Sequence, residues 1–572
     1  MHGLLPAHPG VAADGRLDRG RQGGARGTRR TRRRVLDAVH SGHCQPAAER
    51  LASARGLIMT MNTKLLVIGL DSFDSSLARQ WTDEGRLPHL TAFESRAVAA
   101  PVHNPPGFES GSVWASFAFG ADPGRHGFHD HVRRFDSASY ETSVHDPADN
   151  PATAIWDRLE AAGKRAIVID AVVPPNLRTP NGIRVIDWAA HAPSDGTATL
   201  KLKTWPPALR ETIERDYGAD PLGGKMCDSH RPRSSEEQAG FRDALVRRVA
   251  MKTSLLKDLI AREPWDFCFA SYSEAHCAGH HCWHLNDPGH EEHYPAVAAA
   301  VGNPLRDVYE ALDRAVGDIV AHAGDDVGVM IFMSHGIETG YTGVRLLDRI
   351  LARLDGELNE TRNASLSTAR QVWRSLPQPM RRLLSPARAR FAQSVYREGF
   401  LPHRERRLCF EVFCNERTSG IRINLAGREA HGIVQPGAEF DALCARLKRQ
   451  LLDIHNEETG EPLVLDVVRT SDAYEGAGIA QLPDLLVTWN RAAPIRRVWS
   501  AELGRMHHPH PSIRTGDHRP DGLLLASMPN ATARRLNAPI NVIDLAPSIA
   551  ALFNVETVGF QGRTLDALTG GP

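Results

Sequence analysis

The sequence predicts an α/β fold, with a doubly wound, mostly parallel sheet and an inserted cap region. Three observations predict this fold. Short apolar runs recur along the chain, helical patterns separate several of them, and one long basic stretch breaks the rhythm. Strands that helices bury on both faces are apolar throughout, and alternating strands and helices produce such sheets. A chain of 572 residues is also too long for one compact core.

The first predicted strand is KLLVIGLD, residues 64–71, which ends at Asp71. Open α/β sheets bind their ligands at the carboxyl ends of the strands, so Asp71 is a candidate site residue. The segment DVYEALDRAVGDIVAHA, residues 307–323, is typical of an amphipathic helix. Further strands are predicted at residues 165–171, 266–272, 327–334, 484–489 and 521–527.

The pattern divides the chain into four parts. Residues 1–60 are rich in Arg and Gly and lack apolar periodicity, which indicates a disordered basic extension or a misplaced start. We favour the misplaced start, because Met59 and Met61 come just before the first strand. The cap contains basic amphipathic segments such as RQVWRSLPQPMRRLLSPARARFAQ, and it either covers the core or forms a lid that shapes the substrate pocket. The other expected parts are the first part of the core, the inserted cap and the second part of the core, at residues 61–340, 341–480 and 481–572.

Removing residues 1–58 should leave folding and activity intact, because this segment has no apolar periodicity and no candidate ligand. The yield of soluble protein and the turnover of the truncated chain, compared with those of the full chain, check this expectation. Loss of either would overturn it.

The charge balance limits the classes of partner. Lys plus Arg and Asp plus Glu both number 68, which gives a formal net charge of zero. This balance removes the electrostatic argument for a nucleic acid polymer or an anionic membrane as the main partner. A small anionic substrate would instead need a local positive site, which metal ions can supply.

The cysteine pattern and hydropathy bear on the compartment. The eight cysteines form no CxxC pair and no dense disulfide framework, so we expect reduced, mostly buried thiols. No stretch approaches the roughly 20 apolar residues that a membrane span requires. We therefore expect a soluble, cytoplasmic protein.

The segment NPPGFESGSVWASFAFG, residues 104–120, contains a candidate nucleophile. Pro-Pro-Gly enforces a loop, and SVWASFAFG is typical of a helix. Ser110 would lie near the N-terminus of that helix, where free N–H groups and the helix dipole favour an anion. The alternative is that Ser110 is only the N-cap residue, and Ser112 is the second candidate for the nucleophile.

Histidines cluster in SEAHCAGHHCWH, just after a predicted strand. His276, His280 and His284 are spaced by four, so on a helix they share a face on which two of them can bind one metal ion. Neighbouring His281, like His284, is also compatible with a structural role. In FMSHG, His335 follows another predicted strand. In GDHRPDG, His518 comes just before the predicted strand at residues 521–527. Such strand-end residues converge on one rim of a doubly wound sheet.

These motifs resemble the core motifs of the alkaline phosphatase superfamily. GLDSFD, PPGFESGSVWASFAFGADPGRHGF, SEAHCAGHHCWH, FMSHG and GDHRPDG occur in the family's order. The chain looks most like the type I phosphodiesterase/nucleotide pyrophosphatase branch over residues 64 to 568. The resemblance implies a metal-dependent hydrolase of small phosphate esters, of the phosphodiester or pyrophosphate type, which uses a covalent intermediate.

Carried over by position, the resemblance implies a role for each matching residue. Ser110 matches the nucleophile, and it also contributes to the second metal site together with Asp71 and His335. His280 and His518 match the two histidines of the first metal site. The cofactors implied are divalent metal ions.

Two positions depart from the family pattern. Ser334 stands where the family has the Asp before His-Gly, and His276 stands where it has an Asp four residues before His280. The first site then has three imidazoles, a set suited to tightly bound zinc. The second site keeps one carboxylate, with Ser334 as a weak neutral donor, and should bind its ion less tightly unless another carboxylate substitutes. The candidate substitutes are Glu274, Glu338 and Asp517.

Two alternatives remain open for the function. A sulfatase or phosphonate hydrolase of the same superfamily would use a similar site, because fold and ligands do not distinguish these esters. A sulfatase is disfavoured because Ser110 is followed by Gly111, Ser112 and Val113 rather than by the Pro and Arg of the Cys/Ser-x-Pro-x-Arg signature. The second alternative is a catalytically impaired metal-binding protein that lost turnover together with the second-site aspartate.

Overall fold

The computed structural model describes most of the chain after residue 62. The predicted N-terminal extension, residues 1–60, and the basic cap segment at residues 370–393 lie outside the described residues. The described ranges are 63–130, 133–144, 152–177, 180–191, 199–224, 231–232, 234–356, 403–508, 514–529 and 532–569.

A ten-stranded sheet forms the centre of the described chain. Its strands are β1 (Leu65–Leu70), β2 (Val98–His103), β5 (Ala166–Ile169), β6 (Gly182–Ile186), β7 (Lys203–Trp205), β8 (Phe267–Tyr272), β9 (Gly328–Met333), β19 (Gly522–Ser527), β20 (Arg534–Arg535) and β21 (Ile540–Asn541). Their order is β20-β2-β19-β9-β1-β8-β5-β6-β7, with β21 also paired to β2. The central run from β9 to β6 is parallel, whereas β19 and β7 are antiparallel to their neighbours. The predicted mostly parallel α/β fold is confirmed.

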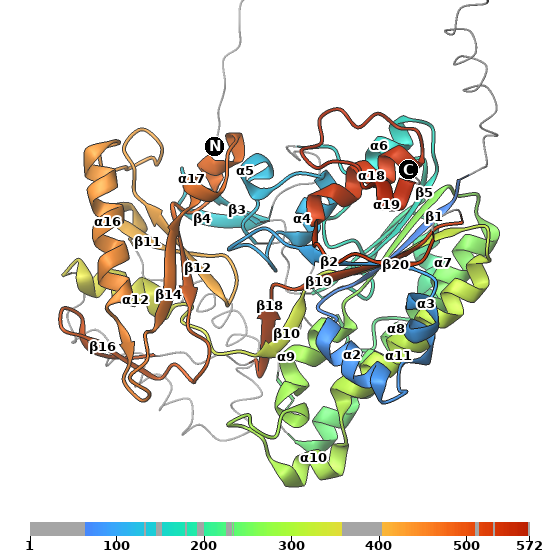
Figure 1. Cartoon of the computed structure of the whole chain (residues 1–572), viewed down its shortest axis with the longest axis horizontal. Helices are drawn as coiled ribbons and strands as arrows, with labels where there is room; N and C mark the ends of the chain where they lie inside the picture. Colours follow the sequence, from blue (N-terminus) through green and yellow to red (C-terminus); the bar gives the residue numbers. More distant parts are fainter. Residues whose placement is uncertain are drawn as a thin grey trace, which may run out of the picture. The chain divides into compact units, whose positions relative to one another are not determined.

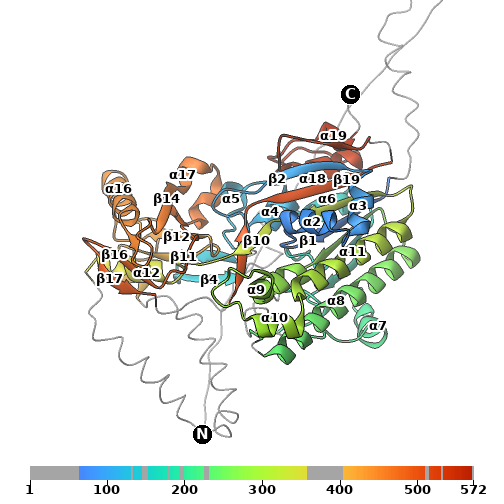
Figure 2. The same ribbon diagram turned by 60° about the horizontal axis from the view of Figure 1, so that its bottom comes forward.

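Helices bury both faces of this sheet. Along β1, Leu66, Ile68 and Leu70 face one hydrophobic core, and Leu65 and Val67 face the other, because successive strand residues point to opposite faces. Both faces of β1 are therefore apolar, which explains the uninterrupted run in the sequence. The first core includes residues of α2 (Ser75–Asp83), α3 (Pro88–Glu94), α8 (Ser235–Arg262), α9 (Glu274–Asn286) and α11 (Pro304–Ala323) (Figure 1). The second includes residues of α4 (Val113–Phe119), α6 (Ile155–Ala161), α18 (Leu545–Leu552) and α19 (Asp566–Thr569) (Figure 2).

One predicted core strand lies elsewhere. Five of the six predicted strands became β1, β5, β8, β9 and β19, but residues 484–489 form β15 (Leu485–Trp489) in a separate sheet. There β15 pairs antiparallel with β12 (Thr418–Ile423) and β14 (Val464–Arg469), and β12 pairs with β11 (Cys409–Phe413). The assignment of this strand to the core was wrong, because a short apolar run does not reveal which sheet buries it.

The second sheet has a hydrophobic core of its own. Its strands β11, β12 and β14 are orange in Figure 1. Residues of α12 (Leu346–Leu354) and α16 (Ala438–Leu452) pack in that core. A three-stranded sheet of β13 (His455–Asn456), β16 (Arg497–Ser500) and β17 (Gly504–His507) adjoins it, so these elements continue past residue 480. The chain then forms β18 (Gly516–Arg519), which pairs with β10 (Gly336–Thr339), before it re-enters the large sheet.

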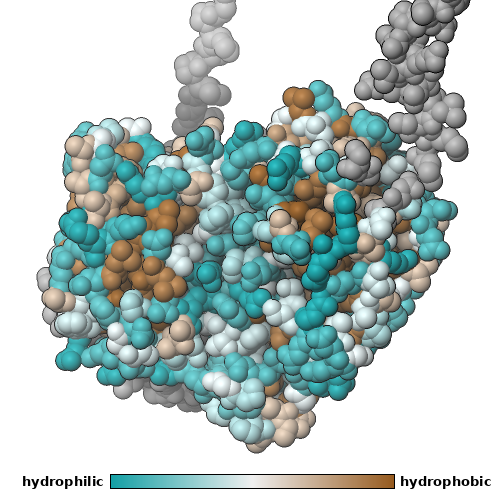
Figure 3. Space-filling model, in the orientation of Figure 1, coloured by the Kyte–Doolittle hydropathy of each residue, from teal (hydrophilic) through white to brown (hydrophobic). Residues whose placement is uncertain are grey.

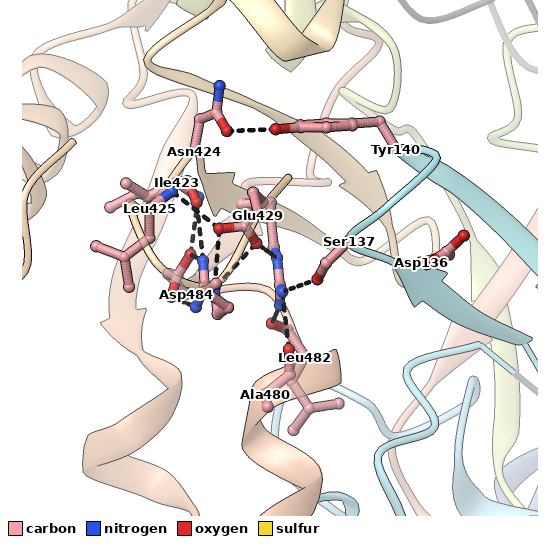
Figure 4. Close-up of polar contacts among 12 residues, drawn as sticks. Asp136, Ser137, Tyr140, Ile423, Asn424, Leu425, Glu429, Ala480, Leu482 and Asp484 are labelled. Carbon is pink, nitrogen blue, oxygen red and sulfur yellow. Dashed lines mark hydrogen bonds and ion pairs between the residues drawn. The ribbon is translucent and has the colours of Figure 1, made fainter. Parts of the chain in front are cut away.

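A buried polar network joins the hairpin of β3 (Arg133–Asp136) and β4 (Glu141–Val144) to the second sheet (Figure 4). The side chains of Arg422 and Glu429 are fully buried, and Arg422 Nε donates to Glu429 Oε1 at 2.7 Å. Arg422 Nη2 also donates to Ser137 Oγ at 3.1 Å, and Tyr140 donates its hydroxyl to Asn424 Oδ1 at 2.8 Å. The hydrogen bonds from Arg422 to Ser137 and from Tyr140 to Asn424 fasten the hairpin to the second sheet, whereas the Arg422–Glu429 ion pair lies within the second-sheet side itself.

The face of the molecule seen in Figure 3 is mostly hydrophilic, with apolar side chains gathered in two areas. Within the described residues, we find no helix with the length and apolar character needed to cross a bilayer.

The cysteines of the described chain are buried free thiols, as the sequence predicted. These are Cys268, Cys277, Cys282, Cys409, Cys414 and Cys444. The remaining two, Cys44 and Cys227, lie outside the described residues.

Candidate active site

The carboxyl ends of three neighbouring strands meet at one edge of the large sheet. Because β8 and β9 both run parallel to β1, the residues after these strands lie side by side. Asp71 follows β1, Ser334 and His335 follow β9, and α9 begins at Glu274 directly after β8. The convergence expected from strand ends is therefore present.

Three predicted metal ligands cluster at this edge. His276 and His280 lie one turn apart on α9, and His518 lies on β18 opposite Ile337 of β10. The ring of His518 is centred 5.0 Å from that of His276 and 4.7 Å from that of His280. Each of the three residues offers a ligand atom within 4.8 Å of the others, and all three are buried. His284 is not a member of this group, and its Nδ1 lies 3.2 Å from the Thr515 hydroxyl.

The geometry of His276 and His280 fits metal coordination. His280 Nδ1 lies 2.8 Å from the carbonyl oxygen of Gly516, which only accepts, so Nδ1 carries the proton and Nε2 presents its lone pair. The two Nε2 atoms lie 3.2 Å apart. Two imidazoles at about 2.0–2.1 Å from a tetrahedral zinc ion would have nitrogens at nearly this separation. Burial, and next the repulsion from His191, lowers the pKa of His276 well below its ordinary value, which favours the neutral form that binds metal.

A hydrogen-bonded chain links the residues predicted for the second metal site. Ser334 donates its hydroxyl to Asp71 Oδ1 at 3.1 Å, so His335 Nδ1, at 2.9 Å, donates to that same serine oxygen. His335 Nε2 then accepts from Ser72 Oγ at 2.8 Å. Trp114 Nε1 also donates to Asp71 Oδ1, at 2.9 Å. Asp71 and His335 thus lie together, 4.0 Å apart between Oδ1 and Nδ1, with Ser334 as the bridge.

Ser110 lies in the segment that leads into α4, and Trp114 of this helix contacts Asp71 at the same edge. The helix starts at Val113 with Ser112 as its N-cap residue, so Ser110 is not the cap. Ser112 Oγ donates to the Phe108 carbonyl at 3.2 Å, whereas the Ser110 hydroxyl makes no hydrogen bond with any described residue. The bond from Trp114 to Asp71 fastens the first turn of α4 to the end of β1. This arrangement favours Ser110 over Ser112 as the reactive hydroxyl.

The three carboxylates considered as substitutes for the missing aspartate have different surroundings. Glu274 is fully buried, but Lys252 Nζ lies 3.6 Å away, and burial raises the pKa of Glu274. Glu338 is 40% exposed and pairs at long range with two arginines. Only Asp517 belongs to a group of described residues with metal-ligand spacing, and that group contains His518.

Arginines at the rim were missed by the sequence analysis. Arg491 Nη1 donates to the carbonyl oxygen of His518 at 2.6 Å, while its buried Nε and Nη2 have no hydrogen-bond partner. Burial raises the pKa of Glu109, the residue before Ser110, and the charges of Arg417 and Arg491 oppose this rise. No local motif marks an arginine that follows a strand, so only the folded chain identifies these residues.

His191 was also missed, and it lies beside the histidine cluster. It follows β6 at the same edge of the sheet, and its ring is centred 4.2 Å from that of His276. Asp71, His191 and His276 offer ligand atoms within 4.8 Å of one another. A lone histidine in a loop carries no signal in the sequence, so this neighbour emerges only from the fold.

The sequence profile of one protein family covers most of the chain. The profile described as type I phosphodiesterase/nucleotide pyrophosphatase matches residues 65–509. The chain belongs to this family. Type I phosphodiesterases and nucleotide pyrophosphatases are hydrolases that act on phosphate esters, so the expected enzyme class is confirmed, and the match covers all of the predicted site residues except His518.

Several solved structures are similar to this phosphodiesterase family member at low identity. Murine ectonucleotide pyrophosphatase/phosphodiesterase 5 is 12% identical, with a TM-score of 0.45, and the match covers 87% of this chain and 97% of that one. Phosphonoacetate hydrolase from Sinorhizobium meliloti 1021, solved with phosphonoacetate, is 12% identical, with a TM-score of 0.46 and coverage of 85% and 94%. Alkaline phosphatase PafA is 11% identical, with a TM-score of 0.48 and coverage of 88% and 99%. No curated protein matches the sequence.

Proposed function

We propose that this chain hydrolyses small phosphodiesters or pyrophosphates through a covalent intermediate on Ser110. The observation that carries the proposal is the pair of buried Nε2 atoms of His276 and His280, 3.2 Å apart beside His518, at the sheet edge that also holds Asp71. Membership of the family supports the class of substrate.

The residues divide the work between binding and displacement. The Ser110 oxygen attacks phosphorus, a P–O bond to serine forms, and the P–O bond to the leaving oxygen breaks. The serine proton passes to solvent, and the leaving oxygen departs as an alcohol or a phosphate. Water then attacks the phosphorus of the substituted seryl ester, which restores the serine hydroxyl and releases the monosubstituted phosphate. Divalent cations, when bound, lower the pKa of a coordinated hydroxyl or water and stabilise charge on the phosphoryl oxygens.

The proposed ligands are assigned as the family resemblance implies. His276, His280 and His518 hold the first ion, for which zinc is the best match to three imidazoles. Asp71 and His335, with Ser110, face the second, and the loss of a carboxylate at Ser334 weakens the attraction for that ion.

Metal analysis combined with a substrate panel tests this function. The panel contains p-nitrophenyl phosphate, bis-p-nitrophenyl phosphate, a p-nitrophenyl phosphonate ester and p-nitrophenyl sulfate. We expect the diester to be hydrolysed at least about tenfold faster, in kcat/KM, than the sulfate. Preference for the sulfate or the phosphonate would redirect the assignment within the superfamily. Bound metal without turnover of any ester would identify an impaired metal-binding protein.

Arg491→Ala should reduce kcat/KM by roughly 10- to 100-fold while the metal content is retained. The buried guanidinium has two nitrogens without hydrogen-bond partners, of which Nη2 lies 3.8 Å from Asp517 Oδ2, and such donors bind anionic oxygens strongly in a low-dielectric site. The measurement is steady-state kinetics with bis-p-nitrophenyl phosphate, alongside metal analysis. Arg497→Ala, which changes an exposed side chain on β16, is the matched control and should behave as the native chain. An Arg491→Ala variant with native kinetics would remove this arginine from substrate binding.

A further inference from the structure

The histidine cluster has a second side that the family pattern does not explain. His276 faces His280 through Nε2, and its other ring nitrogen, Nδ1, is buried without a hydrogen-bond partner. The two nitrogens of an imidazole point away from each other, so Nδ1 faces away from the three-histidine group. A buried nitrogen left without a partner is costly, which indicates that a ligand normally satisfies it.

The residues on this second side are suitable metal ligands. Asp71 and His191 both come from strand ends at the same edge, and their ligand atoms lie within 4.8 Å of that of His276. The rings of His191 and His276 are centred 4.2 Å apart, at an interplanar angle of 64°. One carboxylate and two imidazoles form a donor set that binds zinc and similar divalent ions.

The expected second site is short of donors, which makes an additional ligand necessary. Ser334 supplies only a neutral hydroxyl, which already donates to Asp71. Both ring nitrogens of His335 lie within hydrogen-bond distance of serine hydroxyls, those of Ser72 and Ser334. Of the residues near Asp71, His191 therefore supplies the missing donor.

We propose that His191 is a metal ligand of this chain, and that with Asp71 and His276 it holds the second divalent cation, for which the family pattern offers only Asp71, His335 and Ser110. This inference rests on the proposed metal-dependent function and names a ligand that the resemblance does not supply. His276 belongs to both groups of possible ligands. Its Nε2 faces His280, so the unpartnered Nδ1 is the nitrogen that remains for the second ion. Binding at both nitrogens displaces the ring proton, which passes to solvent.

Three variants of the full chain distinguish the two positions by metal content. After reconstitution with zinc and removal of excess ion, the native chain should hold two equivalents by elemental analysis. His191→Ala should retain one equivalent, His280→Ala should retain one, and His276→Ala should lose both. His284→Ala removes a buried imidazole of the same helix that belongs to neither group, and it should retain two. The equivalent kept by His191→Ala shows that this variant is folded.

The outcomes separate this inference from the function on which it rests. Two equivalents in His191→Ala, released to a chelator at the native rate, would overturn the assignment of His191 and leave the proposed function standing. If the native chain held only one equivalent of zinc and His280→Ala lost it, the second cation position would be excluded and the proposed function would stand. A native chain that takes up no zinc at all would overturn both.

Discussion

Ser110→Ala should lower kcat for ester hydrolysis by at least about 10³-fold, because the hydroxyl oxygen that forms the covalent intermediate is absent. Metal content should stay close to that of the native chain, since the histidine cluster lies on other elements, α9 and β18. The measurement is steady-state turnover of bis-p-nitrophenyl phosphate together with elemental analysis of the same samples.

Ser112→Ala is the matched control for this experiment. Ser112 lies two residues further on, is fully buried, and donates its hydroxyl to the Phe108 carbonyl, so its role is structural. We expect its loss to cost stability of about 1 kcal/mol and to leave most of the turnover. If Ser112→Ala abolishes activity and Ser110→Ala does not, the register of this motif is wrong.

His280→Ala should remove the more tightly bound ion and reduce kcat/KM by at least about 10³-fold. His280 is the histidine whose tautomer is set by the Gly516 carbonyl, so its Nε2 lone pair is held toward His276. Stepwise dialysis of the native chain against a mild chelator should release two ions in separate steps, because the three-imidazole set and the second set, which lacks the family's second carboxylate, differ in affinity. In His280→Ala the slower of the two steps should be missing.

His281→Ala controls for damage to helix α9. His281 is the next residue and equally buried, but its ring packs edge-on against Phe241, with centroids 5.4 Å apart, away from the cluster. This variant should keep both ions and both release steps. A native-like metal content in His280→Ala would contradict the three-histidine assignment.

Much of the fold and part of the site follow from local sequence patterns. Residues 65–70 carry no polar side chain because helices cover both faces of β1, and this pattern was sufficient to place Asp71 at a strand end. The spacing of His276 and His280 placed them on one face of a helix, and the structure has them there. Sequence periodicity was sufficient for these two features because each concerns the position of residues within a single strand or helix.

The tertiary structure decided which elements meet. The strand at residues 485–489 lies in the smaller sheet, since a short apolar run is compatible with either. His191 and Arg491 carry no local signature, and they reach the site only because β6 ends at the same edge and because Arg491 donates to the His518 carbonyl. The sequence by itself determined the fold class and the order of the family's motifs. Long-range strand pairing determined the full set of residues around the histidine cluster, because contacts between distant segments depend on strand order rather than on local periodicity.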